Sequence, residues 1–155
     1  MRTFAVALAL AAVFGTGALF AADSRQADVT EKPDTTEKAL AAISSLDARG
    51  ERIASTYLKD RVAGEPVACL PPGGLRRATS ASDNVLLYES GSVVYVNSPE
   101  PGCPRVRNNM TRRVSPNSRL CTGDILVVFD PMADVHIGSC TLNEFVPFRR
   151  IATED

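Results

Sequence analysis

The chain has almost no histidine: His136 is the only one among 155 residues. A metal site built from several histidines is therefore excluded. There is also no C-x-x-C pair, no D-x-D-x-D-G run, and no glycine-rich loop followed by Lys-Ser or Lys-Thr. These absences argue against the usual zinc, redox, calcium and phosphate-binding motifs. The sequence thus predicts no metal and no cofactor.

A strong charge of either sign is missing as well. Charged residues make up 23% of the chain, the formal net charge is -1, and 45% of the residues are hydrophobic. This balance allows one packed domain and is unlike that of a disordered chain or a strongly basic nucleic-acid-binding protein. We expect no nucleic acid partner.

One long apolar run is present, and it lies at the N-terminus. It follows Met1 and Arg2, extends over residues 4–20, and ends at Ala21 and Ala22 before polar sequence. This order is typical of a signal peptide, and the run is too short for a good membrane span, although an uncleaved anchor is the alternative. We predict a signal peptide at 1–22, a flexible lead-in at 23–34, a periplasmic or secreted location, and no stable membrane span after cleavage.

Four cysteines follow the predicted signal peptide: Cys69, Cys103, Cys121 and Cys140. An even number in an exported chain predicts two disulfides, whereas a structural zinc site prefers two close cysteine pairs. Three pairings are possible. We favour Cys69–Cys140 with Cys103–Cys121, because the first would tie the ends of a β domain together and the second would clamp an arginine-rich loop.

Residues 35–63 are predicted to form one amphipathic helix. Asp34 and Glu37 provide a capping start. Apolar or small residues then recur every three or four positions, at Ala39, Ile43, Leu46, Gly50, Ile53 and Tyr57. We interpret this stripe as packing on the protein's own sheet, with a coiled-coil contact to a partner or a second copy as the alternative. Gly50 favours a bend or a close approach in the middle of the helix.

From residue 67 onward the pattern changes to short apolar runs of strand length, at 85–88, 93–96, 125–129, 135–137 and 145–148. The first two runs flank Gly91 and predict a hairpin. The first three are apolar at successive positions, so we expect both of their faces to be covered. Pro147 predicts an edge strand at 145–148. Segments 71–83 and 98–119 are interpreted as loops.

These elements define the predicted fold class. It is α+β, with an N-terminal helix followed by a small antiparallel β sheet or barrel-like domain over residues 67–150, held by two disulfides.

The segment between Cys103 and Cys121 is rich in arginine and has no acidic residue. Its five arginines are Arg105, Arg107, Arg112, Arg113 and Arg119. Arginine suits contacts with phosphate or carboxylate groups, so the segment is a candidate site for an anionic envelope component or protein. The alternative is a solvated loop whose arginines pair with acidic residues elsewhere in the chain.

His136 is a candidate general base, which would make the protein a hydrolase. A structural role is the alternative, because no nucleophile or orienting group can be assigned from sequence. Asp124, Asp130 and Asp134 are close to it along the chain. Asp124 follows Gly123 and Asp130 precedes Pro131, which are ordinary turn positions, so we do not interpret these residues as a catalytic set.

Several short motifs occur in order over residues 67–148: Gly-Cys-Pro at 102–104, Leu-Cys-Thr-Gly-Asp at 120–124, and Cys-Thr-Leu-Asn-Glu-Phe-Val-Pro at 140–147. This order resembles a family of small exported proteobacterial proteins of unknown function, with four ordered cysteines. The family pattern reads Cys-Pro, Leu-Cys-x-x-Asp and Cys-x-Leu-Gly-x-Phe-x-Pro, and this chain departs from it at Asn143. The resemblance implies a shared fold and compartment and brings no known activity.

The sequence therefore favours an exported, non-catalytic protein with a structural or interaction role in the cell envelope. Anion binding by the arginine-rich segment and hydrolysis through His136 are the two alternatives.

Overall fold

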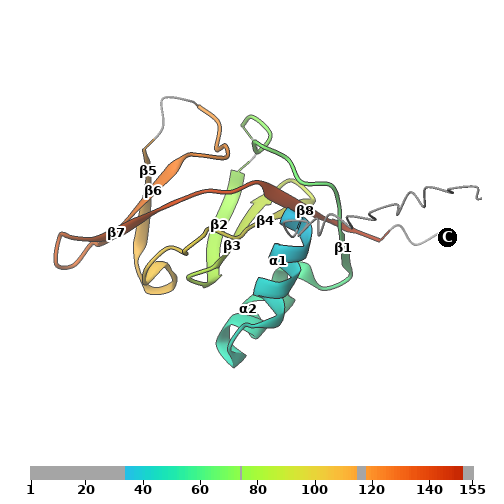
Figure 1. Cartoon of the computed structure of the whole chain (residues 1–155), viewed down its shortest axis with the longest axis horizontal. Helices are drawn as coiled ribbons and strands as arrows, with labels where there is room; N and C mark the ends of the chain where they lie inside the picture. The colour runs from blue at the N-terminus through green and yellow to red at the C-terminus, as the bar shows by residue number, and fades with distance from the viewer. Residues whose placement is uncertain (1–33, 74, 115–117, 152–155) are drawn as a thin grey trace, which may run out of the picture. The chain divides into compact units, whose positions relative to one another are not determined.

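The computed structural model describes residues 34–73, 75–114 and 118–151, so the predicted signal peptide and nearly all of the lead-in lie outside the described residues. Two helices precede eight strands and a short 3-10 turn (Figure 1). The elements are α1 (Thr35–Ser44), α2 (Ala48–Leu58), β1 (Arg61–Ala63), β2 (Leu75–Ser82), β3 (Val85–Ser90), β4 (Val93–Asn97), η1 (Val106–Asn108), β5 (Met110–Val114), β6 (Ile125–Asp130), β7 (Val135–Thr141) and β8 (Phe145–Arg150).

The strands form two antiparallel sheets. The five-stranded sheet has the order β1-β8-β4-β3-β2, and the three-stranded sheet has the order β5-β6-β7. The predicted α+β class, with an antiparallel β domain and two disulfides, is confirmed. None of the helices in the described ranges is long and apolar enough to cross a membrane.

Residues 35–63 form two helices and a strand instead of the single helix predicted. Helix α1 ends near Ser44 and Ser45, whose hydroxyls donate to the carbonyls of Ala41 and Ala42. Asp47 then caps α2, because its carboxylate accepts a hydrogen bond from the Gly50 amide at 2.7 Å. The apolar spacing continues across this break and conceals it, since Leu46 between the helices is also buried.

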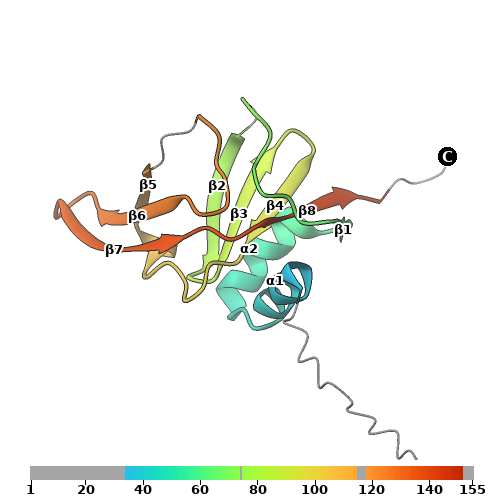
Figure 2. The same cartoon turned by 45° about the horizontal axis from the view of Figure 1, so that its top comes forward.

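The helices cover one face of the five-stranded sheet (Figure 2). Ala39, Leu46 and Ala54 pack with buried residues of β2, β3, β4 and β8 in one hydrophobic cluster. This contact confirms that the stripe packs on the protein's own sheet. Gly50 is buried, and a Cβ atom there would lie 2.7 Å from the Ala81 carbonyl oxygen of β2. The close approach predicted at Gly50 is therefore confirmed.

Strands β3 and β4 form the predicted hairpin, and Gly91 has the positive φ of 59° that its turn requires. Both faces of these strands are buried, as predicted. Leu87 belongs to the cluster under the helices, whereas Leu86 and Tyr88 belong to a second cluster on the opposite face.

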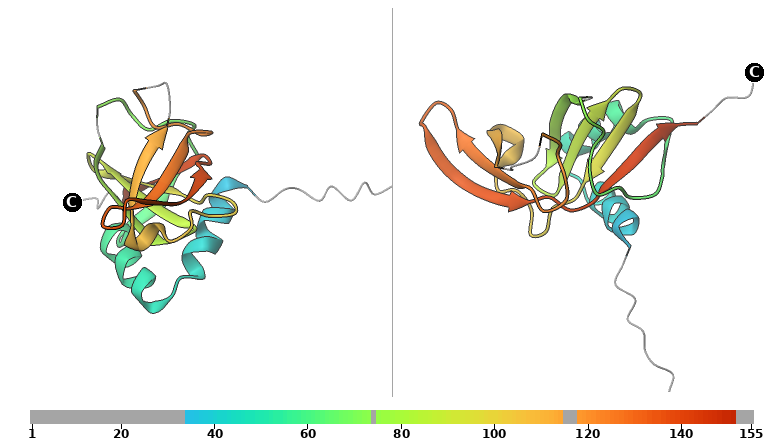
Figure 3. Two further views of the ribbon diagram at one scale, coloured as in Figure 1. Left: turned by 90° about the vertical axis from the view of Figure 1, so that its left-hand side faces the viewer. Right: turned by 90° about the horizontal axis from the view of Figure 1, so that it is seen from above.

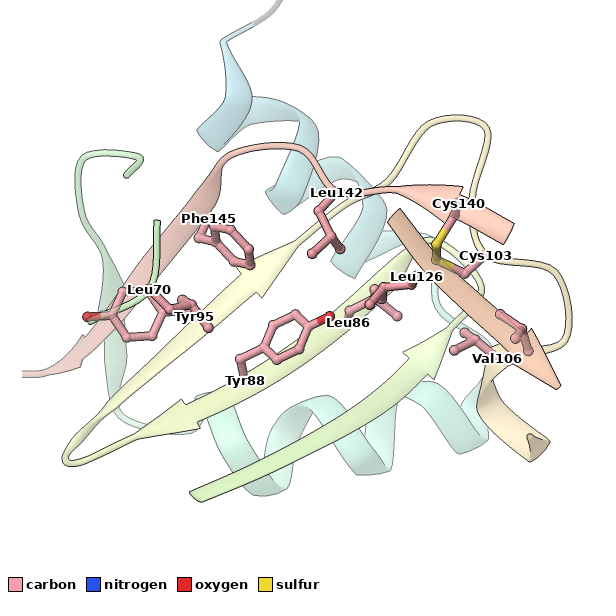
Figure 4. Packing of buried hydrophobic residues seen from close by; sticks show 11 residues of the cluster. Leu70, Leu86, Tyr88, Tyr95, Cys103, Val106, Leu126, Cys140, Leu142 and Phe145 are labelled. Carbon is pink, nitrogen blue, oxygen red and sulfur yellow. A yellow bond between two sulfur atoms is a disulfide. The ribbon is translucent and has the colours of Figure 1, made fainter. Parts of the chain in front are cut away.

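The second cluster joins the two sheets (Figure 4). Leu126 and Val128 of β6 contribute to it from the three-stranded sheet. The rings of Tyr88 and Phe145 make an edge-to-face contact with centroids 5.7 Å apart within it. The molecule thus stacks helices, the five-stranded sheet and the three-stranded sheet in that order.

The disulfides join Cys69 to Cys121 and Cys103 to Cys140, so the favoured pairing is wrong. Backbone hydrogen bonds from Leu70 to Leu120 and from Thr122 to Ala68 place Cys69 beside Cys121. Cys140 of β7 pairs with Leu126 and points to the inner side of the three-stranded sheet. Cys103 lies in the same hydrophobic cluster and therefore meets Cys140 there. Sequence order does not reveal either neighbourhood.

Strand β8 is an interior strand and not an edge strand, since it pairs with both β1 and β4. The Gly64 amide donates to the Pro147 carbonyl at 2.8 Å. In an antiparallel strand, the N and O atoms of one residue point to the same side. The missing N–H of Pro147 therefore faces Gly64, just past the end of β1, and the ladder with β4 loses no donor.

Three further expectations differ from the structure. Strands β2 and β5 occur where loops were predicted, because polar and arginine-rich residues on exposed edges conceal them. The apolar run 125–129 is covered on one face only: Leu126 and Val128 are buried, whereas Ile125 is 44% exposed.

Candidate binding groove

The outermost strands β2 and β5, from different sheets, border an open groove. Within the described residues, β2 pairs only with β3, and β5 pairs only with β6. Two hollows of about 340 and 570 Å³ lie here and share Ala78, Tyr88, Thr111 and Leu126 as lining residues. Their shared walls make them one groove between two strand edges.

The groove lining combines apolar side chains and a tyrosine ring with the hydroxyl-bearing residues Thr79, Ser80 and Thr111. Leu86 and Leu126 line it from the two sheets, and Tyr88 lies beside Leu86 with its hydroxyl toward that residue (Figure 4). Burial raises the pKa of Tyr88 well above its ordinary value of 10.0, so the hydroxyl stays protonated and can donate a hydrogen bond. The described residues offer this hydroxyl no hydrogen-bond partner.

Three of the five predicted anion-binding arginines line the groove: Arg107, Arg113 and Arg119. Arg107 donates to both carboxylate oxygens of Asp47, at 2.8 and 2.9 Å, and to the Ala81 carbonyl. This hydrogen bond raises the pKa of Arg107 and lowers that of Asp47. The Arg113 guanidinium lies 4.0 Å from the Asp124 carboxylate.

Arg119 differs from these two because its Nε donates to a neutral acceptor, the Leu70 carbonyl, at 3.2 Å. Among the described residues that line the two hollows there is no aspartate or glutamate. Arg107 and Arg113 thus pair with acidic residues of the chain, as the alternative to anion binding predicts. Arg119 keeps a charge that no described carboxylate balances.

The other two arginines lie elsewhere. Arg105 adopts a left-handed conformation with φ 56°, and its amide donates to the Asp83 carboxylate. Arg112 lines a separate hollow on the outer face of the three-stranded sheet. The five arginines therefore do not form one cluster, and anion binding by all of them stays a prediction.

His136 is exposed and lines the same outer hollow as Arg112, Phe129 and Asp134. A hydrolase requires a nucleophile within hydrogen-bond reach of the base. Among the described residues that line this hollow there is no serine, threonine or cysteine, and the His136 imidazole makes no hydrogen bond to a described residue. This geometry does not favour the hydrolase alternative.

Two of the three nearby aspartates serve turns, as interpreted from sequence. Asp124 is buried and accepts a hydrogen bond from the Cys121 amide at 2.8 Å. Asp130 accepts from the amide of Met132 at 2.8 Å.

Sequence reasoning missed the walls and floor of the groove. Tyr88 and Leu126 read as ordinary core residues, and Ala78 and Thr111 fall in segments interpreted as loops. The sequence of β5, Met-Thr-Arg-Arg-Val, has no alternation that would mark a strand, and nothing local marks its approach to β2.

Comparisons with known proteins find no match: no family model, curated protein or solved structure resembles this chain. The family resemblance inferred from the ordered cysteines stays a prediction.

Proposed function

We propose that this protein is an exported, non-catalytic binding module that holds an extended peptide segment in the groove between β2 and β5, with a peptide carboxylate at Arg119. The observation that carries the proposal is the pair of strand edges that have no strand partner within the described residues and that border one groove. Export to the periplasm or the medium is supported by the two disulfides, which persist in oxidising compartments.

Strand edges bind peptides by main-chain hydrogen bonds, and pockets beside them select side chains. Within the described residues each edge has no neighbouring strand, although the Ala81 carbonyl of β2 accepts from Arg107, while Leu86 and Leu126 offer apolar contact between the edges. An extended backbone can use both features at once, because its groups point to its edges and its side chains alternate between its faces.

The arginine side chains give the groove a preference for negatively charged groups. A guanidinium has five donors, and the described contacts of Arg119 use one of them. A peptide carboxylate can take up others as charge-assisted hydrogen bonds. The described residues that line the groove include no histidine or carboxylate, the usual general bases, which supports binding over catalysis.

The test uses an array of random peptides of about ten residues, which exceeds the usual strand length, followed by NMR titration of the best binder. We expect acid-bearing peptides to be selected, with amide shifts concentrated in β2 and β5. Arg119→Gln should weaken binding about tenfold, the equivalent of one charge-assisted hydrogen bond. Arg76→Gln is the matched control, because Arg76 is an exposed β2 residue that does not line the groove.

Two results would contradict the proposal. Selection of basic peptides would exclude the role of Arg119, and amide shifts outside β2 and β5 would place binding elsewhere.

A further inference from the structure

The outer face of the three-stranded sheet has an apolar middle strand, β6, flanked by polar residues of β5 and β7 such as Arg112, Ser139 and Thr141, and no element among the described residues covers it. Leu126 and Val128 of β6 point into the core with Thr111 and Arg113 of β5 as their cross-strand partners. The alternating residues point outward. These outward residues include Arg112, Val114, Ile125, Val127 and Phe129.

Several apolar side chains on and beside this face are exposed to solvent. Val114 and Ile125 are 54% and 44% exposed, and Met132, at the turn between β6 and β7, is 94% exposed. Contiguous exposed apolar surface marks an interaction site more often than scattered apolar residues do. The unbroken apolar run at 125–129 is what a strand covered on both faces would have.

The face also contains a hollow of about 360 Å³, lined by Val127, Phe129, Val135, His136, Arg112 and Asp134. Its walls carry one positive and one negative charge beside apolar side chains. A two-fold interface requires a patch that is complementary to itself, with residue i of one copy meeting residue j of the other and the reverse. A patch that holds both Arg112 and Asp134 has the charges for such an exchange, because each arginine can face the aspartate of the other copy.

We propose that this face binds the same face of a second copy of the chain. Arg112 of each copy pairs with Asp134 of the other, and Met132 of each copy inserts beside the hollow of the other. The end of the β6–β7 hairpin extends away from the five-stranded sheet, which leaves it accessible to a second molecule (Figure 3). The binding groove lies on the other side of β5, so pairing of the outer faces leaves it open.

The size of the face sets the expected strength. Three strands of five to seven residues cover roughly 15 by 20 Å. This is less than a standard stable interface, which buries about 800 Å² on each partner. We therefore expect a weak, reversible dimer with a dissociation constant on the order of 10 µM or higher.

The test is sedimentation velocity over a range of concentrations, on the full chain produced through the export pathway and used as recovered. Met132→Asp should raise the dimer dissociation constant about tenfold or more, since it places a charge in the interface. Leu40→Asp is the matched control, because Leu40 is 46% exposed on α1, outside this face. The control should dimerise like the wild type.

A charge reversal at Arg112, combined with a charge neutralisation at Asp134, tests the proposed geometry. Arg112→Glu alone should weaken the dimer, because it sets Glu beside Asp134 of the second copy. Adding Asp134→Asn should restore part of the affinity, and Asn tolerates the left-handed backbone of this residue, φ 49°. Circular dichroism of each variant separates loss of dimer from loss of fold.

The proposal fails if the wild type stays monomeric at millimolar concentration. It also fails if Met132→Asp and Leu40→Asp have equal effects, or if Asp134→Asn recovers nothing in the Arg112→Glu background. Wild-type monomer that binds anionic phospholipid vesicles through Met132 would assign the face to lipid instead.

Discussion

The two sheets use similar apolar strands in different ways. The five-stranded sheet is covered by the helices on one face and by the three-stranded sheet on the other. Within the described residues, the three-stranded sheet is covered on one face and leaves its outer face and its β5 edge open. The difference indicates that the first sheet holds most of the buried core, whereas the second sheet carries the exposed surface on which the two proposals depend.

The test with the largest expected effect replaces one phenylalanine between the two sheets and one on the outer face. Phe145→Ala should lower the free energy of unfolding by about 4 kcal/mol, since Phe145 is fully buried between the sheets. Phe129→Ala should cost less than about half of that, because Phe129 lies on the outer face and is half-buried. Urea denaturation at low protein concentration measures both; equal losses would show that the outer face is as well covered as the core.

A second test concerns the helix layer over the five-stranded sheet. Gly50→Ala in a helix would ordinarily stabilise it, but here the added Cβ would lie 2.7 Å from the Ala81 carbonyl. We expect a net loss of about 1–2 kcal/mol from overpacking. Ser55→Ala, on the exposed side of α2, should be neutral or slightly stabilising. A thermal unfolding series decides the sign, and a gain at Gly50 would disprove the close approach.

The smallest effect concerns the link between the helix layer and the arginine-rich segment. The Arg107 guanidinium and the Gly50 amide hold the pKa of Asp47 below its ordinary value of 3.8. A lowered pKa in the folded state adds stability that is present above pH 3.8 and is lost as the pH falls through the folded value. Asp47→Asn should reduce this acid-dependent loss, measured by urea midpoints between pH 2 and 6. An unchanged pH profile would show that the pair is broken in solution.

Much of the local structure could be predicted because its causes are local. The turn at Gly91 follows from the need for positive φ, and the approach at Gly50 follows from the absence of a side chain. The run 125–129 shows the limit of such reasoning. It resembles 93–96 in sequence, yet nothing in the run itself reports which of its faces is covered.

The candidate groove was less predictable than the fold. Three of its arginines were identified from composition, but Tyr88 and Leu126 were not distinguishable from core residues. Strands β2 and β5 are polar because each has an open edge, and that same polarity hides them from a search for apolar runs.

The sequence alone determined the α+β class, the main hairpin, the apolar helix stripe and the presence of cysteines able to pair. Each depends on residue types and spacings a few positions apart. The tertiary structure alone decided that Cys69 meets Cys121 and Cys103 meets Cys140, that β8 is an interior strand, and that β2 faces β5. These features depend on how the two sheets pack on one another, and that packing brings together residues far apart along the chain.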